Sequence, residues 1–281
     1  MNRYIPTVLI IGFVLLLFSC EEPEESVAPA TPIAEITDEV KAQFLSIGFD
    51  PSDLAIQDGN YLVEGDVLVS PQTLEHLLSL STTKDHPQGE QFRTSLVVSS
   101  SYRTIKVRQM SPDAQLSKAL GRAISNYNSL GLRFRVQEVP SSDPADISIY
   151  VSGISSLGIA KFPYVGFAGG SFPSVLVTRP GGRVEIGRSA FNGTDDFLEH
   201  VVTHELGHCL GMRHTDWYNR SLSCGSGSSE GTGSAGAVHI PGTPAQTTRP
   251  PDPTSIMNAC VPGGSSGEFS AYDKIAWRQV Y

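Results

Sequence analysis

Apolar and polar residues recur along the chain at spacings that predict a mixture of helices and strands. Residues 40–47 have apolar side chains at helical spacing, 61–69 have the pattern of an extended stretch, and 72–80 fit a second short helix. Residues 82–94 are polar and contain a proline and a glycine, which is typical of an exposed linker. We therefore expect a small module that a linker separates from the rest.

A different organisation begins after this linker. Residues 102–109 alternate between apolar and polar as a strand does. The Ser-Pro-Asp run at 111–113 marks a helix start, with the serine as capping residue and the proline at the first helical position. Helical spacing then continues to Gly131, and strands are expected at 132–139 and 146–151. This order predicts a mixed sheet with a helix laid across it.

The stretch 152–190 is rich in glycine and harder to divide into elements. Short strands are expected at 164–168, 175–178 and 183–186. The Pro-Gly-Gly sequence at 180–182 predicts a turn that joins the last two strands as a hairpin. Such a hairpin would leave one edge of a sheet open.

The first 20 residues have the pattern of an export signal. An apolar run at 7–19 follows Arg3 and ends at Cys20, and it is short for a bilayer span. The stretch Leu-Phe-Ser-Cys at 17–20 resembles the bacterial lipobox, whose cysteine is acylated and becomes the mature N-terminus. We predict a lipoprotein signal peptide over 1–20 and a lipid anchor at Cys20. The alternative is an ordinary signal peptide, which would leave a secreted protein.

Residues 21–33 are expected to form a solvated tether. They open with four glutamates and continue as a Pro/Ala-rich stretch, a composition that cannot bury a core. An acidic run directly after a lipidated cysteine resembles a signal for display on the outer face of the outer membrane. Alternatively, the run is only a solvated tether and carries no localisation signal. We expect an exported outer-membrane lipoprotein, which the first alternative would place on the cell surface.

The charge distribution excludes one class of partner. The chain has 281 residues, with 20 Lys and Arg against 29 Asp and Glu, and its net charge is −9. Residues 21–60 hold ten acids and one base, so the acidic excess lies there and the remainder is close to neutral. A nucleic-acid binder needs a concentrated basic face, and the sequence contains no such cluster. We therefore expect no nucleic-acid partner.

The helix expected before Gly211 carries residues with recognisable metal chemistry. His204 and His208 are four residues apart, so both imidazoles project from the same side of a helix, and Glu205 lies next to the first. Two imidazoles at this spacing can hold one Zn²⁺, but a catalytic zinc site needs a third protein ligand. Gly211 lets the chain turn, and His214 follows three residues later as that ligand.

The complete string HELGHCLGMRH, from His204 to His214, resembles the extended zinc-binding signature of the metzincins. Ser-Ile-Met-Asn at 255–258 resembles the Met-turn that follows it in those proteins. Together with HIPGTP and the closing FSAYDKIAWRQVY, these strings resemble the HEIGH-type bacterial metallopeptidases of the metzincin clan. The resemblance covers about 102–281. The segment IGFDPSDLAIQDGNYLVEGD also resembles the stretch before the catalytic domain in those proteins, where it is taken for a propeptide.

The resemblance implies an α+β fold. The catalytic domain, 102–281, would have a twisted mixed sheet, two long helices, and a C-terminal subdomain with the Met-turn and a final helix. A propeptide-like module with its linker would precede it at 34–95. In metzincins an open sheet edge pairs with the extended substrate, and we expect that edge within 164–187.

The resemblance also assigns roles to single residues. Glu205 would be the general base, and Met257 would pack beneath the metal without binding it. Asp216 would either orient a ligand histidine or cap a loop. Some metzincins have a tyrosine that helps to bind the oxyanion where this chain has Ala259, so the source of that donor stays open. His200, one turn before His204, is expected on the helix surface.

Latency and disulfide pairing leave several candidates. A carboxylate of the module could block the open metal position, and Asp50, Asp53 and Asp66 are available for this. Three cysteines remain after Cys20 and allow three different single bridges. We favour Cys224 with Cys260, because Cys209 lies within the helix that carries the metal ligands.

These observations predict a zinc-dependent endopeptidase that hydrolyses extracellular or cell-surface proteins. Its partners would be a polypeptide substrate and a lipid anchor, and a monomer is expected. One alternative is a surface-displayed binding protein on an inactive metzincin scaffold. Another is a zinc amidase that acts on cell-wall or small amide substrates.

Overall fold

The computed structural model describes residues 35–80, 91–167, 176–226, 237–244, 252–261 and 264–281. The fold described below belongs to the unit Pro32–Tyr281. The signal peptide, the tether and Cys20 lie outside the described residues and stay predictions. Among the residues that are described, no helix is long and apolar enough to span a membrane.

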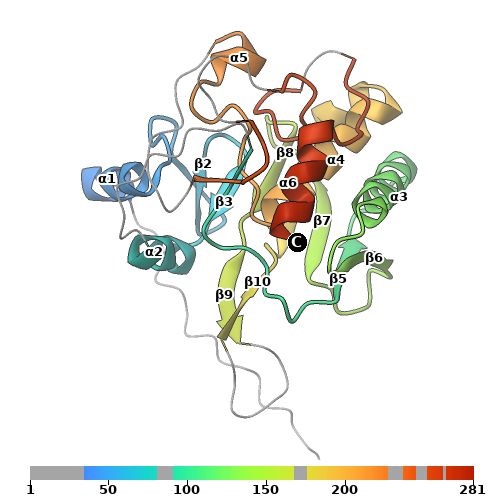
Figure 1. Cartoon of the computed structure of the whole chain (residues 1–281), viewed down its shortest axis with the longest axis horizontal. Coiled ribbons are helices and arrows are strands. Elements are labelled where there is room, and N and C mark those ends of the chain that lie inside the picture. Colours follow the sequence, from blue (N-terminus) through green and yellow to red (C-terminus); the bar gives the residue numbers. More distant parts are fainter. Residues whose placement is uncertain (1–34, 81–90, 168–175, 227–236, 245–251, 262–263) are drawn as a thin grey trace, which may run out of the picture. The chain divides into compact units, whose positions relative to one another are not determined.

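Eight strands form one mixed sheet in the order β1-β2-β3-β8-β11-β7-β5-β6 (Figure 1). Pairing is parallel for β3–β8, β11–β7, β7–β5 and β5–β6, and antiparallel for β1–β2, β2–β3 and β8–β11. The strands are β1 (Ala55–Gln57), β2 (Asn60–Val63), β3 (Val67–Val69), β5 (Thr104–Gln109), β6 (Arg135–Val139), β7 (Ile147–Ser152), β8 (Gly158–Lys161) and β11 (Arg183–Gly187).

Three helices pack together on the catalytic half of this sheet: α3 (Ala114–Ser129), α4 (Asp195–Cys209) and α6 (Ala271–Val280). Tyr127 of α3 connects them, because its ring lies 5.0 Å from both Phe269 and Trp277 and its hydroxyl donates to Thr203 O of α4. The expected α+β fold, with a mixed sheet, two long helices and a final helix, is confirmed.

The start of α3 differs in detail from the prediction. The capping residue is Asp113, whose carboxylate accepts from the backbone N–H groups of Gln115 and Leu116. Ser111 instead accepts from Val151 N with its hydroxyl, at 3.0 Å. The carboxylate of Asp113 already accepts from two of the helix's first N–H groups. The Ser111 hydroxyl is therefore not needed as a cap, and it connects the loop to β7.

The Gly-rich stretch folds differently from the expected hairpin. β9 (Tyr164–Phe167) pairs with β10 (Leu176–Arg179) in a separate two-stranded sheet, whereas β11 joins the main sheet. Gly181 packs so tightly that a Cβ there would lie 1.5 Å from Lys161 O, and its N–H donates to Cys209 O. The Pro-Gly-Gly segment therefore packs closely against Lys161 and Cys209 and does not form the turn of a hairpin. β8 is a strand that sequence patterns missed.

The N-terminal module, residues 35–80, is part of the same sheet as the rest. Thr37 caps α1 (Asp38–Ile47), and α2 (Pro71–Leu80) follows β3. The module's apolar core includes Leu96 and Phe162 of the following domain. β3 pairs in parallel with β8 through Val67↔Ala160 and Leu68↔Lys161. In Figure 1, α1 and α2 lie beside β2 and β3, at the end of the sheet away from α3.

The remaining elements lie around the metal-binding region. They are β4 (Phe92–Arg93), which pairs with β12 (Val238–His239), the 3-10 helix Arg188–Asn192, and α5 (Ser221–Cys224). A disulfide joins Cys224 to Cys260 with a Cα–Cα distance of 5.1 Å, as predicted. Cys209 is buried and reduced. The disulfide fastens α5 to the segment that follows the Met-turn.

Candidate metal centre

Three imidazoles converge at the C-terminal end of α4. The ring centroids of His204 and His208 are 4.6 Å apart, and that of His214 lies 5.3 Å from the first and 4.9 Å from the second. All three side chains are buried. The spacing of four residues on one helix therefore has the predicted effect, and the third histidine joins the other two.

Hydrogen bonds to carbonyl groups set the tautomers of the two helical histidines. The Nδ1 of His204 lies 2.8 Å from Ile256 O, and the Nδ1 of His208 lies 2.8 Å from Met212 O. A carbonyl oxygen can only accept, so each Nδ1 carries the hydrogen and each Nε2 keeps a free lone pair. The two Nε2 atoms lie 3.0 Å apart. Burial lowers the pKa of His208 well below its usual value, which favours the neutral form that binds metals.

Gly211 allows the turn that brings His214 to this cluster. Its φ of 96° lies in the left-handed region, and a Cβ there would lie 2.5 Å from Leu96 O. Thr94 N donates to Gly211 O at 2.8 Å, so the turn is fastened to the segment before β5. Both the conformation and the close packing therefore require glycine at this position.

Met257 packs directly beneath the helix that carries the ligands. It is fully buried, and a Cβ on Gly207, between His204 and His208, would lie 2.5 Å from its sulfur. Its carbonyl accepts from Thr215 N at 2.7 Å, next to the third histidine. The residue thus contacts both parts of the chain that carry the three histidines.

Asp273 holds the Met-turn in place, a role that the sequence did not reveal. Ser270 and Asp273 form the capping box of α6. The same carboxylate also accepts from Ser255 Oγ at 2.7 Å and from Ile256 N at 2.9 Å. Burial raises the pKa of Asp273, although these hydrogen bonds act in the opposite direction. The last helix therefore positions the carbonyl that orients His204.

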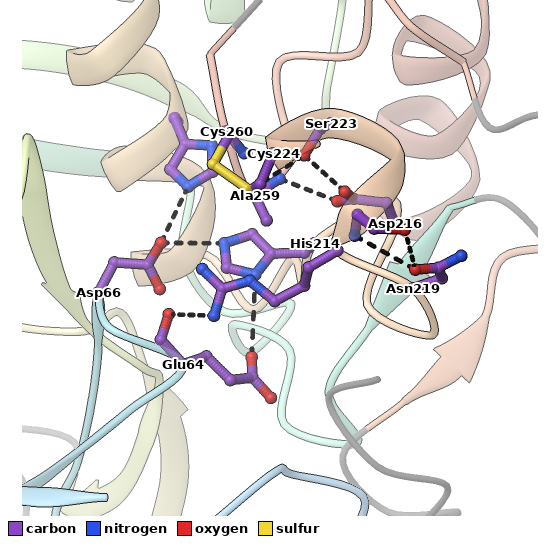
Figure 2. Close-up of a disulfide and its surroundings, with 12 residues drawn as sticks. Glu64, Asp66, His214, Asp216, Asn219, Ser223, Cys224, Ala259 and Cys260 are labelled. Atoms are coloured by element: carbon purple, nitrogen blue, oxygen red, sulfur yellow. Dashed lines mark hydrogen bonds and ion pairs between the residues drawn. A yellow bond between two sulfur atoms is a disulfide. The ribbon is translucent and has the colours of Figure 1, made fainter. Parts of the chain in front are cut away.

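Asp216 lies close to the centre but contacts a loop (Figure 2). Its carboxylate accepts from Ala259 N at 2.9 Å and from Ser223 Oγ at 2.5 Å. The same hydroxyl accepts from Cys260 N at 3.0 Å. Of the two roles considered for Asp216, these contacts correspond to the loop-fastening one, and the carboxylate supports the metal site only through the Met-turn segment.

Glu205 faces a cavity beside the histidines. The cavity has a volume of about 470 Å³, and its lining includes Glu205, His204, Leu157, Phe197 and Val261. The Oε2 of Glu205 is buried and has no hydrogen-bond partner within the described ranges. Burial, reinforced by the charge of a nearby aspartate, raises the pKa of Glu205 well above its usual value.

Gly158 of β8 makes room for that carboxylate. A Cβ at Gly158 would lie 2.2 Å from Glu205 Oε1, 2.5 Å from its Cδ and 2.7 Å from its Cγ. β8 and the candidate base therefore lie in direct contact. Because β8 itself was missed, nothing in the sequence pattern indicated this glycine.

Asp66 is the fourth group at the centre, and Figure 2 shows it facing His214. Its Oδ2 lies 3.0 Å from His214 Nε2 and 3.8 Å from His204 Nε2. Burial alone would raise the pKa of Asp66, but the charges and hydrogen bonds of these histidines lower it well below its usual value. Asp50 and Asp53, the other two candidates, line a different cavity with Arg220 and the disulfide.

Asp66 and the three histidines form a donor set that suits a metal ion. One ligand atom from each lies within 4.8 Å of all the others. The Peptidase family model for dual-action HEIGH metallo-peptidases matches residues 61–281. The chain belongs to this family. The match begins in β2 and so includes the turn that carries Asp66.

The chain is also similar to solved structures, at low identity. Myroilysin has 16% identity over 64% of this chain and 94% of that chain, with a TM-score of 0.35. The hatching enzyme high choriolytic enzyme 1 from the medaka fish Oryzias latipes has 18% identity over 63% and 88%, also with a TM-score of 0.35. No sequence among the curated proteins matches. The assignment rests on the family match.

The family and the donor set agree on the metal. Imidazole nitrogens with one carboxylate oxygen are ligands that Zn²⁺ prefers, and three histidines leave a fourth position for water or another group. The predicted zinc metallopeptidase, with Zn²⁺ as its cofactor and a polypeptide as its substrate, is thereby confirmed.

The expectation that His200 lies on the helix surface is wrong. His200 is buried, 2% exposed, and neither ring nitrogen has a hydrogen-bond partner among the described residues. Other parts of the chain cover α4 on the side that carries His200 as well as on the side that carries the three-histidine cluster. β9 and β10 form a two-stranded sheet of their own, and β11 lies inside the main sheet between β8 and β7, so the substrate-binding edge expected within 164–187 stays a prediction. β8, at 158–161, pairs with β3 of the N-terminal module.

Proposed function

We propose that this HEIGH metallo-peptidase is an endopeptidase that cleaves extracellular or cell-surface proteins, with Glu205 as the general base. The observation that carries the proposal is the position of the Glu205 carboxylate. It is buried beside three converging imidazoles, it faces a cavity of about 470 Å³, and its Oε2 has no hydrogen-bond partner in the described part of the chain.

The chemistry follows from the groups at the centre. When bound by His204, His208 and His214, Zn²⁺ supplies a water of lowered pKa and a Lewis acid for the scissile carbonyl. Glu205 accepts a proton from that water and delivers it to the amine nitrogen of the leaving product.

The chain as described is a zymogen in this proposal. The Asp66 carboxylate lies 3.0 Å from His214 Nε2, where it can take the fourth metal position in place of water. The turn that presents it has two consecutive left-handed residues, Glu64 at φ 61° and Gly65 at φ 83°. The module's β3 also covers the edge of β8. Release of the propeptide, which we place at 34–95, would free both the fourth metal position and the edge of β8.

The proposed location follows from the N-terminal sequence. A signal peptide at 1–20 and acylation of Cys20 would make the protein an exported outer-membrane lipoprotein, held by the tether at 21–33 and active as a monomer. Mass spectrometry of the mature N-terminus tests this. A diacylated or triacylated cysteine as the first residue supports the proposal, and an unmodified N-terminus beyond Cys20 would contradict it in favour of a secreted protein.

Casein zymography with the Glu205→Gln variant tests the function. Removal of a general base lowers rates by roughly 10²–10⁴-fold. We expect the wild-type protein to clear casein, and the variant to bind zinc equally but leave casein intact. If neither protein cleaves casein or any peptide while both bind zinc, the chain is a binding protein on a peptidase scaffold. Cleavage of simple amides alone would favour an amidase.

A further inference from the structure

Arg213 is a fully buried cation next to the metal centre. It lies between Met212, whose carbonyl orients His208, and His214, and it is 1% exposed. Arginine is almost never buried to this extent unless it is paired. Other groups in the chain must therefore compensate the charge of Arg213.

The N-terminal module provides contacts on several sides of this guanidinium. The Glu64 carboxylate, itself 1% exposed, forms a short ion pair with Nη2. The carbonyl of Gly48 accepts from Nη1 at 2.5 Å, and the Phe49 ring lies 4.1 Å from the guanidinium carbon. From the rest of the chain, the Trp217 ring lies 5.8 Å away. Release of the module would remove a carboxylate, a carbonyl and a ring from Arg213.

Glu64 reaches Arg213 from within the segment that crosses the metal centre. It is two residues before Asp66, and its Oε2 lies 3.9 Å from His214 Nδ1 (Figure 2). The strand that follows, β3, lies along β8, the strand that contacts Glu205 through Gly158. An extended peptide bound along β8 would therefore pass close to the position that Glu64 now occupies.

We propose that Arg213 determines substrate specificity by binding an acidic side chain of the substrate where Glu64 binds in the intact chain. The proposal rests on the proposed endopeptidase function. Arginine pairs with carboxylates through two parallel hydrogen bonds, and such charge-assisted bonds are stronger than neutral ones. A buried cation that loses its partner is strongly destabilised, so a site vacated by Glu64 favours another carboxylate.

Matched peptides test this on the protein that forms from the full chain by processing. A fluorogenic peptide with one glutamate is compared with the same peptide carrying glutamine, for each position around the cleaved bond. At one position we expect kcat/KM to be about ten-fold or more higher with glutamate, since a hydrogen bond between two charged groups is stronger than one to a neutral amide. The ratio is taken on one preparation, so it does not depend on the folded fraction.

Variants of Arg213 assign the preference to that side chain. Arg213→Lys should keep a reduced preference for glutamate, Arg213→Met should abolish it, and Arg213→Glu should shift it toward lysine. Equal rates for glutamate and glutamine at every position in the wild type would overturn the proposal. An undiminished preference in Arg213→Met would do the same.

A binding measurement separates this inference from the proposed function. The peptide of residues 60–69 and its E64Q form are titrated against the processed protein, and the fluorescence of Trp217, near Arg213, reports binding. We expect the E64Q peptide to bind about ten-fold more weakly. Failure to cleave any peptide, with this discrimination retained, would refute the function and support the acidic site. Cleavage with equal binding of both peptides would refute only the acidic site.

Discussion

The carboxylate of Asp66 lies 3.0 Å from the Nε2 atom of His214, although the two residues are 148 positions apart in the chain. The nitrogen belongs to the third metal ligand and the oxygen to the N-terminal module. One contact thus connects the segment proposed to be removed with the chemistry proposed to follow its removal.

Asp66→Asn should activate the full-length protein. The amide keeps the shape of the side chain but is a much weaker metal ligand than a carboxylate, so water can compete for the fourth position. We expect casein cleavage by the unprocessed chain to rise at least ten-fold with zinc content unchanged. Asp53→Asn is the matched control, because Asp53 lines a different cavity. Equal activity of wild type and Asp66→Asn before processing would refute carboxylate latency.

Gly158→Ala should impair turnover without loss of metal. The added Cβ would lie within 2.2–2.7 Å of three atoms of the Glu205 side chain, which must move away from its place beside the histidines. We expect kcat/KM to fall by roughly 10²-fold, since a displacement of about 1 Å can have that effect. Gly153→Ala serves as control, because nothing lies within 4 Å of its Cβ position. Activity near the wild-type value would show that Glu205 does not need this position.

Gly207→Ala should destabilise the fold around the Met-turn. Its Cβ would lie 2.5 Å from the Met257 sulfur, and overpacking of this kind costs about 1–3 kcal/mol. Urea unfolding measures the loss. In contrast, Gly121→Ala in α3, with nothing within 4 Å of the new Cβ, should stabilise by about 0.5–1 kcal/mol through helix propensity. Equal shifts of the two variants would contradict the close packing of Met257.

The acid stability of the fold should depend on His200. Burial, with a smaller contribution from His204, lowers its pKa to about 3, whereas the unfolded chain takes up this proton near pH 6.5. Neutral His200 therefore contributes stability that is fully present above pH 6.5 and is lost as the pH falls toward 3. The loss amounts to about 4 kcal/mol at pH 3.

His200→Phe removes this titration and should flatten the pH profile. We would measure urea unfolding of metal-free wild type and variant from pH 7.5 to 4, so that protonation of the metal ligands affects both equally. The wild type should lose stability relative to the variant as the pH falls. Profiles that stay parallel over this range would show that His200 is protonated to the same extent in the folded and unfolded states.

The parts of the site that the sequence predicted are those set by local geometry. His204 and His208 meet because a helix brings residues four apart to one side, and the turn at Gly211 needs only three more residues to deliver His214. In each case the relevant residues lie within about a dozen positions, where the backbone conformation alone determines which side chains meet.

The parts that were missed depend on pairing between distant segments. β8 is four residues long with no alternation, and it forms a strand because β3 and β11 provide hydrogen-bond partners on both sides. The pairing of Glu64 with Arg213 joins positions 149 residues apart. Asp66 could be named as one of three candidates, but only the register of β3 on β8 distinguishes it from Asp50 and Asp53.

The parallel pairing of β3 with β8 also affects the risk that the protein aggregates before the module is removed. Exposed strand edges are templates on which other chains polymerise. While β3 is in place, the backbone of β8 is satisfied and cannot recruit a second molecule. This edge would thus stay closed until the module is released, and only then could it recruit other chains.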